Sequence, residues 1–117
     1  MVRIAVIDDY QLVAHRMADW DSLPEGTDID FYQDHLSDLA SLVGRLGNYE
    51  VVQFMRERTP FTKPLLDALP KLELLSGTGG GFRSFDIDAA TERGVLITRS
   101  SGAGSSTEEL AWALILA

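Results

Sequence analysis

Four short segments of the chain combine charged and small residues in a way that suits an anion site. They are Asp8-Asp9, Arg56-Glu57-Arg58, the run from Gly77 to Arg83, and Arg99-Ser100-Ser101. Three of them contain arginine, whose planar guanidinium matches two oxygens of a carboxylate or phosphate. Two are rich in glycine or serine and offer closely spaced backbone N–H groups. Each arginine alone is explained as a solvated loop charge, but together they predict a site for a small carboxylate or phosphate.

The glycine run does not fit a dinucleotide-binding turn. It contains G-x-G, but Phe82 stands at the last position of G-x-G-x-x-G. The next strand ends in Thr98-Arg99, without the acidic residue that would hold a ribose. No Gly-Lys-Ser/Thr follows, which excludes a P-loop. A backbone site for a small anion and a flexible structural turn remain alternatives for this loop.

The pair Asp8-Asp9 opens an alternative from another class of protein. Two acidic residues after the first strand are typical of phosphoryl-accepting receiver modules of about this length. Such a module also needs an aspartate ending the third strand and a lysine ending the fifth, where this chain has Arg56 and Arg99. We therefore interpret Asp8 as a cap or turn residue before the first helix.

Histidine and serine indicate no catalytic or metal site. His15 and His35 have no second ligand at metal spacing, and the chain has no cysteine. We expect both to be surface or partly packed side chains. The serines lie in loops or at a helix start, and no nucleophile elbow is present.

Apolar runs and amphipathic stretches alternate along the chain and must position these segments. The expected strands cover residues 2–7, 28–33, 51–55, 72–75 and 95–98, and the expected helices cover residues 13–20, 36–46, 62–69 and 86–93. Thr62 is expected to cap the third helix. This alternation predicts an α/β fold, a flavodoxin-like open doubly wound parallel sheet of about five strands with helices on both faces. Ligands bind such sheets at the carboxyl ends of the strands, where all four segments lie.

Composition limits the class of protein. The 117 residues include 18 acidic and 10 basic side chains, a net charge of −8, with 45% hydrophobic residues. This indicates one folded domain with no affinity for nucleic acid. The absence of cysteine excludes disulfides and thiolate metal sites and favours the cytoplasm. No signal peptide is visible, and the longest apolar run, Leu110 to Ala117, is far short of the about 20 residues that span a membrane.

The final segment resembles a helix without a proper end. Ser106 and Glu109 have capping-box spacing, and the residues that follow are apolar on all sides up to Ala117. No glycine, lysine or arginine closes the helix. Such a helix must be buried. We expect that it packs on a partner or that the natural chain is longer, and we favour the second.

The segment from Leu72 to Ala117 resembles the D-isomer-specific 2-hydroxyacid dehydrogenases of the phosphoglycerate dehydrogenase-like type. The most specific stretches are DIDAATERGV and EELAWALILA, and both IAVIDDYQ and MRERTPFTKPLLDALPKL look like one branch of the family. The resemblance implies a flavodoxin-like substrate domain, built from the N-terminal part and a C-terminal return, with a Rossmann domain between them. Residues 1–105 would be the substrate-binding domain. Residues 106–117 would lead toward the absent nucleotide-binding domain, near the contact of a homodimer.

The resemblance also implies an activity. The full-length enzyme would transfer hydride between NAD or NADP and a 2-hydroxy or 2-keto acid. The catalytic arginine, glutamate and histidine of the family all come later in the chain. The 117 residues alone are therefore expected to be inactive and to bind no cofactor. A stand-alone flavodoxin-like module, either anion-binding or a degenerate receiver, is the alternative.

Two features of the family's substrate site match this chain. Arg56 matches the arginine that contacts the substrate carboxylate, and the loop Gly79-Gly80-Gly81 matches the one whose backbone amides hold it. The chain departs from the family at Gly80, Arg83 and Ala103, where valine or isoleucine, aspartate and asparagine are common. These departures leave the identity of the 2-hydroxy acid open.

Overall fold

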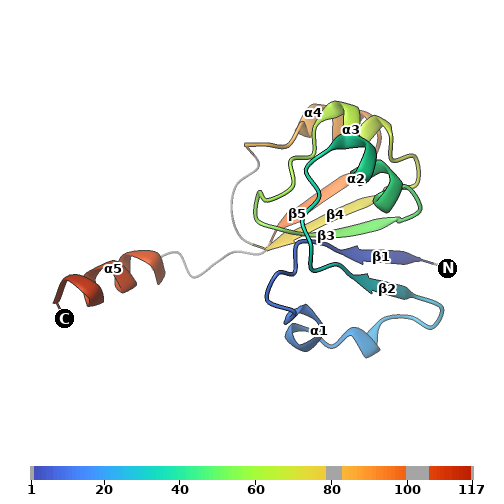
Figure 1. Ribbon diagram of the computed structural model, residues 1–117. Coiled ribbons are helices and arrows are strands. Elements are labelled where there is room, and N and C mark those ends of the chain that lie inside the picture. The colour runs from blue at the N-terminus through green and yellow to red at the C-terminus, as the bar shows by residue number, and fades with distance from the viewer. Residues whose placement is uncertain (1, 79–82, 100–105, 117) are drawn as a thin grey trace.

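A computed structural model describes residues 2–78, 83–99 and 106–116. Its centre is a five-stranded parallel sheet with the strand order β2-β1-β3-β4-β5 (Figure 1). The strands are β1 (Arg3–Val6), β2 (Asp28–Phe31), β3 (Val51–Met55), β4 (Leu74–Thr78) and β5 (Leu96–Arg99). This order confirms the predicted flavodoxin-like sheet. All strands run in one direction, so their carboxyl ends form one edge.

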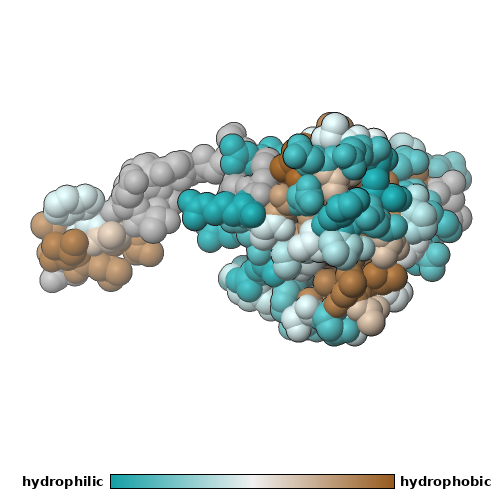
Figure 2. Space-filling view, turned by 90° about the horizontal axis from the view of Figure 1, so that it is seen from above, coloured by the Kyte–Doolittle hydropathy of each residue, from teal (hydrophilic) through white to brown (hydrophobic). Residues whose placement is uncertain are grey.

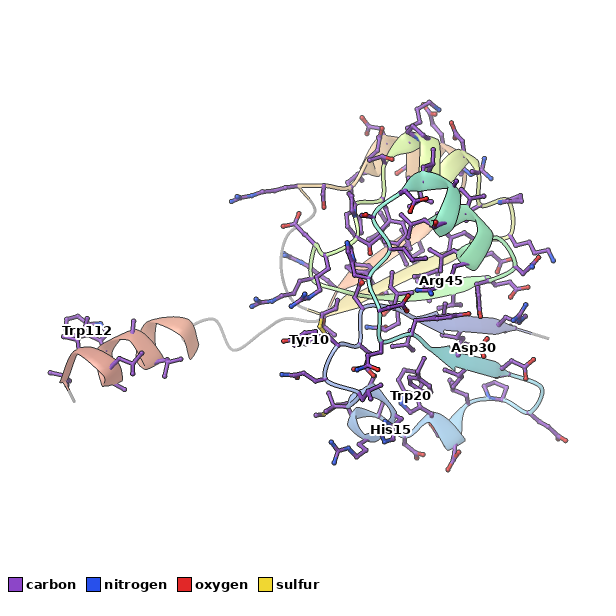
Figure 3. The ribbon with its side chains drawn as sticks, viewed as in Figure 1. Tyr10, His15, Trp20, Asp30, Arg45 and Trp112 are labelled. Carbon is purple, nitrogen blue, oxygen red and sulfur yellow. The ribbon has the colours of Figure 1, made fainter. Side chains whose placement is uncertain are left out.

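Helices lie on both faces of the sheet, as predicted. They are α1 (Ala14–Met17), α2 (Leu39–Leu46), α3 (Lys63–Asp67), α4 (Ile87–Glu92) and α5 (Ser106–Leu116), with a 3₁₀ turn η1 (Trp20–Ser22). Figure 1 shows α2, α3 and α4 together on one side and α1 on the other. Trp20 belongs to the α1 side, where its indole Nε1 donates to the carbonyl of Ala14 at 2.8 Å and its ring meets Phe31 edge-on (Figure 3).

The core lies between the sheet and the layer of α2, α3 and α4. Val52 and Leu75 are fully buried there. Three phenylalanine rings, Phe54, Phe61 and Phe85, contact one another with centroids 4.8–6.1 Å apart. Phe54 comes from β3, whereas Phe61 and Phe85 precede α3 and α4. The trio therefore joins two loops of the carboxyl edge to the sheet beneath them.

One strand differs from its predicted bounds in a way that changes the glycine loop. β4 runs from Leu74 to Thr78, two to three residues later than expected, so Gly77 is a strand residue. It pairs with Phe54 of β3, and a Cβ on Gly77 would overlap the Phe54 ring. Close packing of strand and ring, rather than loop flexibility, explains this glycine.

The first helices also differ from expectation. The helix predicted over residues 13–20 is only four residues long before η1, and Met17 is 74% exposed. The second helix begins at Leu39 rather than at residue 36. The reason is that the Asp38 carboxylate accepts a hydrogen bond from the Ser41 amide at 2.9 Å and caps the helix there. Leu39, expected on the buried face, is consequently exposed.

The third helix begins where predicted, with one difference. Thr62 is its N-cap residue, but its side chain makes no capping hydrogen bond. Pro64 occupies the first turn, where the missing N–H costs nothing.

The last helix, α5, lies away from the sheet, and Trp112 marks it in Figure 3. Its apolar side chains are exposed, from 61% for Leu110 to 79% for Leu116. Figure 2 shows this hydrophobic surface on the helix. Among the described residues, no helix is long and apolar enough to cross a membrane.

Candidate anion site at the carboxyl edge

Non-glycine residues with a left-handed backbone lie at the carboxyl edge of the sheet. Among the described residues, those other than glycine with positive φ are Asp8 (59°), Leu12 (53°) and Arg56 (50°). Asp8 and Leu12 follow β1, and Arg56 follows β3. The left-handed conformation costs an L-residue about 1–2 kcal/mol and is concentrated at functional sites. The geometry therefore points to the edge that the sequence predicted.

Arg56 occupies a tight turn at the end of β3. The turn is closed by a hydrogen bond of 3.2 Å from the amide of Arg58 to the carbonyl of Met55. The Arg56 amide donates to the carbonyl of Thr78 at the end of β4, at 3.3 Å. Its side chain is exposed and makes no hydrogen bond or ion pair with any residue that the structure describes. A guanidinium held in this way is available to an anion.

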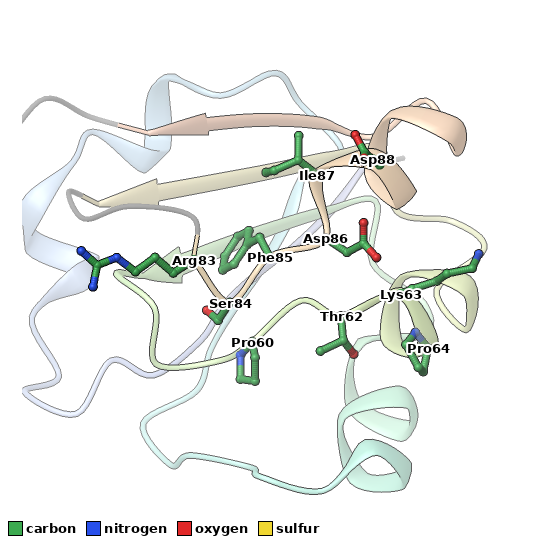
Figure 4. A pocket seen from close by; sticks show the side chains of 10 residues that line it. All are labelled: Pro60, Thr62, Lys63, Pro64, Arg83, Ser84, Phe85, Asp86, Ile87 and Asp88. Carbon is green, nitrogen blue, oxygen red and sulfur yellow. The ribbon is translucent and has the colours of Figure 1, made fainter.

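The other arginines of the predicted site are placed differently. The Arg58 guanidinium lies over the ring of Tyr10, 4.2 Å from its centroid. Arg83 is exposed at one end of a groove on the α3–α4 side (Figure 4). Arg99 is the last residue of β5 and has interactions of its own. Gly79, Gly80 and Gly81 lie outside the described residues. The carbonyl of Thr78, directly before them, accepts the hydrogen bond from the Arg56 amide.

The two acidic residues after β1 have different tasks. Asp9 is 1% exposed, and its carboxylate accepts hydrogen bonds from the amides of Val13 and Ala14, at 3.1 and 3.2 Å. Asp9, rather than Asp8, thus supports the start of α1. Of the two roles expected for Asp8, a cap or a turn residue, the structure shows the turn: the amide of Tyr10 donates to the Asp8 carbonyl at 2.9 Å.

The Asp8 carboxylate is buried and joins three segments. Asp8 is 3% exposed; its Oδ2 accepts a hydrogen bond from the Thr59 hydroxyl at 2.6 Å, and its Oδ1 lies 2.8 Å from Nδ1 of His35. The sequence analysis missed this contact. The only local signals were the two acidic residues after a strand and a threonine in the M-R-E-R-T segment. Neither identifies partners 27 and 51 positions away.

The loops of this edge are also tied to one another. The amide of Ser84 donates to Oε1 of Glu57 at 3.1 Å, and the amide of Asp86 donates to the carbonyl of Phe61 at 2.9 Å. The loop after β3 is therefore fixed to the loop before α4. A rigid frame of this kind holds a binding group in one orientation.

Two hollows flank the edge. The groove of about 850 Å³ in Figure 4 lies between the starts of α3 and α4, with Lys63 and Arg83 at opposite ends. A smaller hollow of about 250 Å³ lies under α1, lined mainly by apolar side chains such as Val13, Met17 and Met55. Within the described ranges, no three acidic or histidine side chains gather to hold a metal ion. His15, as expected, lies at the surface, edge-on to Phe31.

The sequence model for the catalytic domain of the D-isomer specific 2-hydroxyacid dehydrogenases matches residues 4–113. The chain belongs to this family. A crystal structure of a phosphoglycerate oxidoreductase from Vibrio cholerae o395 supports the assignment. It is 37% identical, covers 99% of the chain and superimposes with a TM-score of 0.86.

Two relatives with assigned activities are similar over shorter stretches. A glyoxylate reductase from Thermococcus litoralis is 39% identical over 56 residues, which make up 47% of this chain. A D-3-phosphoglycerate dehydrogenase from Archaeoglobus fulgidus is 32% identical over 77 residues, 65% of this chain. These stretches cover 17% and 14% of the two dehydrogenases, and the chain covers 36% of the Vibrio structure. The chain therefore corresponds to a minor part of the dehydrogenases that it matches.

Proposed function

We propose that the chain is the substrate-binding part of an NAD(P)-dependent 2-hydroxyacid dehydrogenase. The complete enzyme transfers hydride between a nicotinamide cofactor and a 2-hydroxy or 2-keto acid. Residues 1–105 form the substrate-binding domain, and residues 106–117 lead toward a nucleotide-binding domain. Membership of the family supports this proposal, and so do the two relatives named for glyoxylate and D-3-phosphoglycerate.

The described residues do not fit a nicotinamide dinucleotide. Gly77, which would open a dinucleotide-binding turn, is a strand residue packed against Phe54. The strand that follows ends at Arg99 rather than at an acidic residue. We therefore assign this chain no part in cofactor binding and expect the 117 residues alone to be inactive.

The proposed role of Arg56 rests on one observation: its guanidinium is exposed at the carboxyl edge and pairs with none of the described residues. In this proposal the guanidinium binds the substrate carboxylate through paired hydrogen bonds. The backbone amides of Gly79, Gly80 and Gly81 complete the site from the end of β4. Fixing the carboxylate orients the α-carbon of the substrate toward the cofactor. The cofactor supplies the hydride chemistry, and the protein contributes this orientation.

The assembly and location of the enzyme are also part of the proposal. We place the enzyme in the cytoplasm as a homodimer, with α5 near the contact between subunits. The exposed apolar surface of α5 supports a contact between subunits at this helix.

Replacement of Arg56 in the native-length enzyme tests the site. With glyoxylate or hydroxypyruvate as substrate and NADH or NADPH as cofactor, we expect R56A to raise KM for the keto acid by about 10- to 100-fold. That is the effect of losing a charge-assisted hydrogen bond. The KM for the cofactor should not change. R93A removes the same charge from the far end of α4 and is the control.

The result that overturns the assignment is an unchanged KM for the keto acid in R56A. Binding of small anions by an enzyme that reduces no 2-keto acid would instead support a stand-alone anion-binding module.

A further inference from the structure

We propose that Asp8, acting through Thr59, is the positioning residue that fixes the orientation of Arg56. This inference rests on the proposed function of Arg56 as the group that binds the substrate carboxylate. Asp8 itself does not touch the substrate in this scheme. Asp8 is 3% exposed, and its two carboxylate oxygens are hydrogen-bonded to the Thr59 hydroxyl and to His35.

The turn that carries Arg56 is held at both ends. At its start, the Arg56 amide is bonded to the carbonyl of Thr78 in the neighbouring strand. Directly beyond its far end at Arg58, Thr59 is 2% exposed, and its hydroxyl donates a hydrogen bond to the Asp8 carboxylate at 2.6 Å. A hydroxyl that donates to an ionised carboxylate makes one of the stronger hydrogen bonds in proteins. The turn is therefore pinned to β4 on one side and to the end of β1 on the other.

Backbone strain indicates why this anchoring matters. Arg56 has φ 50° at the position of the turn where glycine is ordinarily preferred. A non-glycine residue stays in that conformation only when its surroundings determine it. Asp8 is strained in the same way, with φ 59°. Two strained residues, joined through Thr59, thus stand at the ends of neighbouring strands. Release of the Thr59 anchor should let Arg56 relax and turn its guanidinium away from the substrate.

His35 is the second hydrogen-bond partner of the Asp8 carboxylate, beside Thr59. Its ring binds the second Asp8 oxygen at 2.8 Å, yet the side chain is 48% exposed. His35 follows β2, so the Asp8 carboxylate joins the ends of β1 and β2 to the loop after β3. The contact through His35 is the outer, more accessible one, and its loss should have the weaker effect on Arg56.

The test is a double-mutant cycle between Thr59 and Arg56 in the native-length enzyme, with glyoxylate and NADH. T59V keeps the shape of the side chain but removes the hydroxyl. We expect it to raise KM for glyoxylate about tenfold with KM for NADH unchanged, and T59S to restore the original KM. In the R56A background, T59V should cause no further change, because there is no guanidinium left to orient. T91V, which removes an exposed hydroxyl from α4, is the matched control.

The outcomes separate the two proposals. If R56A alone leaves KM for glyoxylate unchanged, the proposed function of Arg56 fails, and the positioning role falls with it. If R56A raises KM but T59V does not, or if the two effects multiply in the double mutant, only the positioning role of Asp8 is overturned. Should T59V fail to fold, H35A replaces it in the same cycle. We expect H35A to raise KM for glyoxylate about threefold, and this increase to disappear in the R56A background. If H35A leaves KM unchanged, or if it raises KM by the same factor in the R56A background, the inference is overturned.

Discussion

At the scale of single residues, two residues of the same type take different roles because the fold places them differently. Gly44 and Gly77 illustrate this. Gly44 lies in the exposed middle of α2 with open space around its Cα. Gly77 lies in β4 with the ring of Phe54 where a Cβ would be. The first glycine carries only the entropic cost of a flexible residue in a helix, whereas the second is required by packing.

Replacing each of these two glycines by alanine should change the free energy of unfolding in opposite directions. G77A should lower the free energy of unfolding by about 1–3 kcal/mol, because an added methyl group forces the buried Phe54 ring to move. G44A should raise it by about 0.5–1 kcal/mol, the ordinary gain from alanine in a helix. Urea unfolding followed by circular dichroism measures both. A G77A variant as stable as the wild type would contradict the packing described for β4.

At the scale of elements, the start of α2 shows how one side chain sets a boundary. Hydrogen bonds from Ser41, from both its hydroxyl and its amide, hold the pKa of Asp38 below its ordinary value. A carboxyl whose pKa is lower in the folded state stabilises the fold at pH values above its unfolded pKa. That contribution is lost as the pH falls through the folded pKa. The cap of α2 is therefore a pH-dependent part of the fold.

This cap should be visible in acid. We expect the stability of the wild-type chain to fall more steeply than that of D38N as the pH is lowered from about 5 to about 2. The reason is that D38N has no carboxyl to protonate. S41A, which keeps the amide donor but loses the hydroxyl, should behave in between. Thermal unfolding at a series of pH values measures the difference, and parallel curves for wild type and D38N would contradict the cap.

At the scale of the whole molecule, apolar surface is left open in two places. One is α5, whose Leu114 and Ile115 are 70% and 71% exposed. The other is a row across the sheet on the face away from α2, α3 and α4. There the half-buried Val51 and Leu74 pair in register between the buried Ile4 and Leu96, which is 62% exposed. Exposed apolar surface of this kind favours association.

We expect association of the chain to depend on the apolar surface of α5. At micromolar concentrations we expect the 117-residue chain to sediment as a dimer or larger species, and the double variant L114E/I115E to sediment as a monomer. L96E places the same charge on the open row of the sheet and tests the other surface. Sedimentation velocity distinguishes the two. If L96E abolishes association while L114E/I115E does not, the sheet rather than α5 forms the contact.

The sequence by itself determined the class of fold and predicted the edge of the sheet for the candidate site. Apolar runs and helical periodicity are local signals, so residues close in the sequence predict five strands, the alternating helices and the edge where Arg56 lies. The family followed from motifs that are also local. The exact bounds of α2 and β4 did not follow from the sequence, because the cap at Asp38 and the contact between Gly77 and Phe54 depend on neighbours in space.

Only the tertiary structure decided what surrounds Arg56. The Asp8 carboxylate meets His35 and Thr59 because β1 is paired with both β2 and β3 in the sheet. No local pattern records such a pairing, since each partner looks like an ordinary polar loop residue by itself. The same holds for the left-handed backbone of Arg56, whose amide is hydrogen-bonded to Thr78 of β4 and whose turn is followed by Thr59, hydrogen-bonded to Asp8 after β1. Residue types fix which groups are available for chemistry, whereas the pairing of distant strands fixes which of them meet.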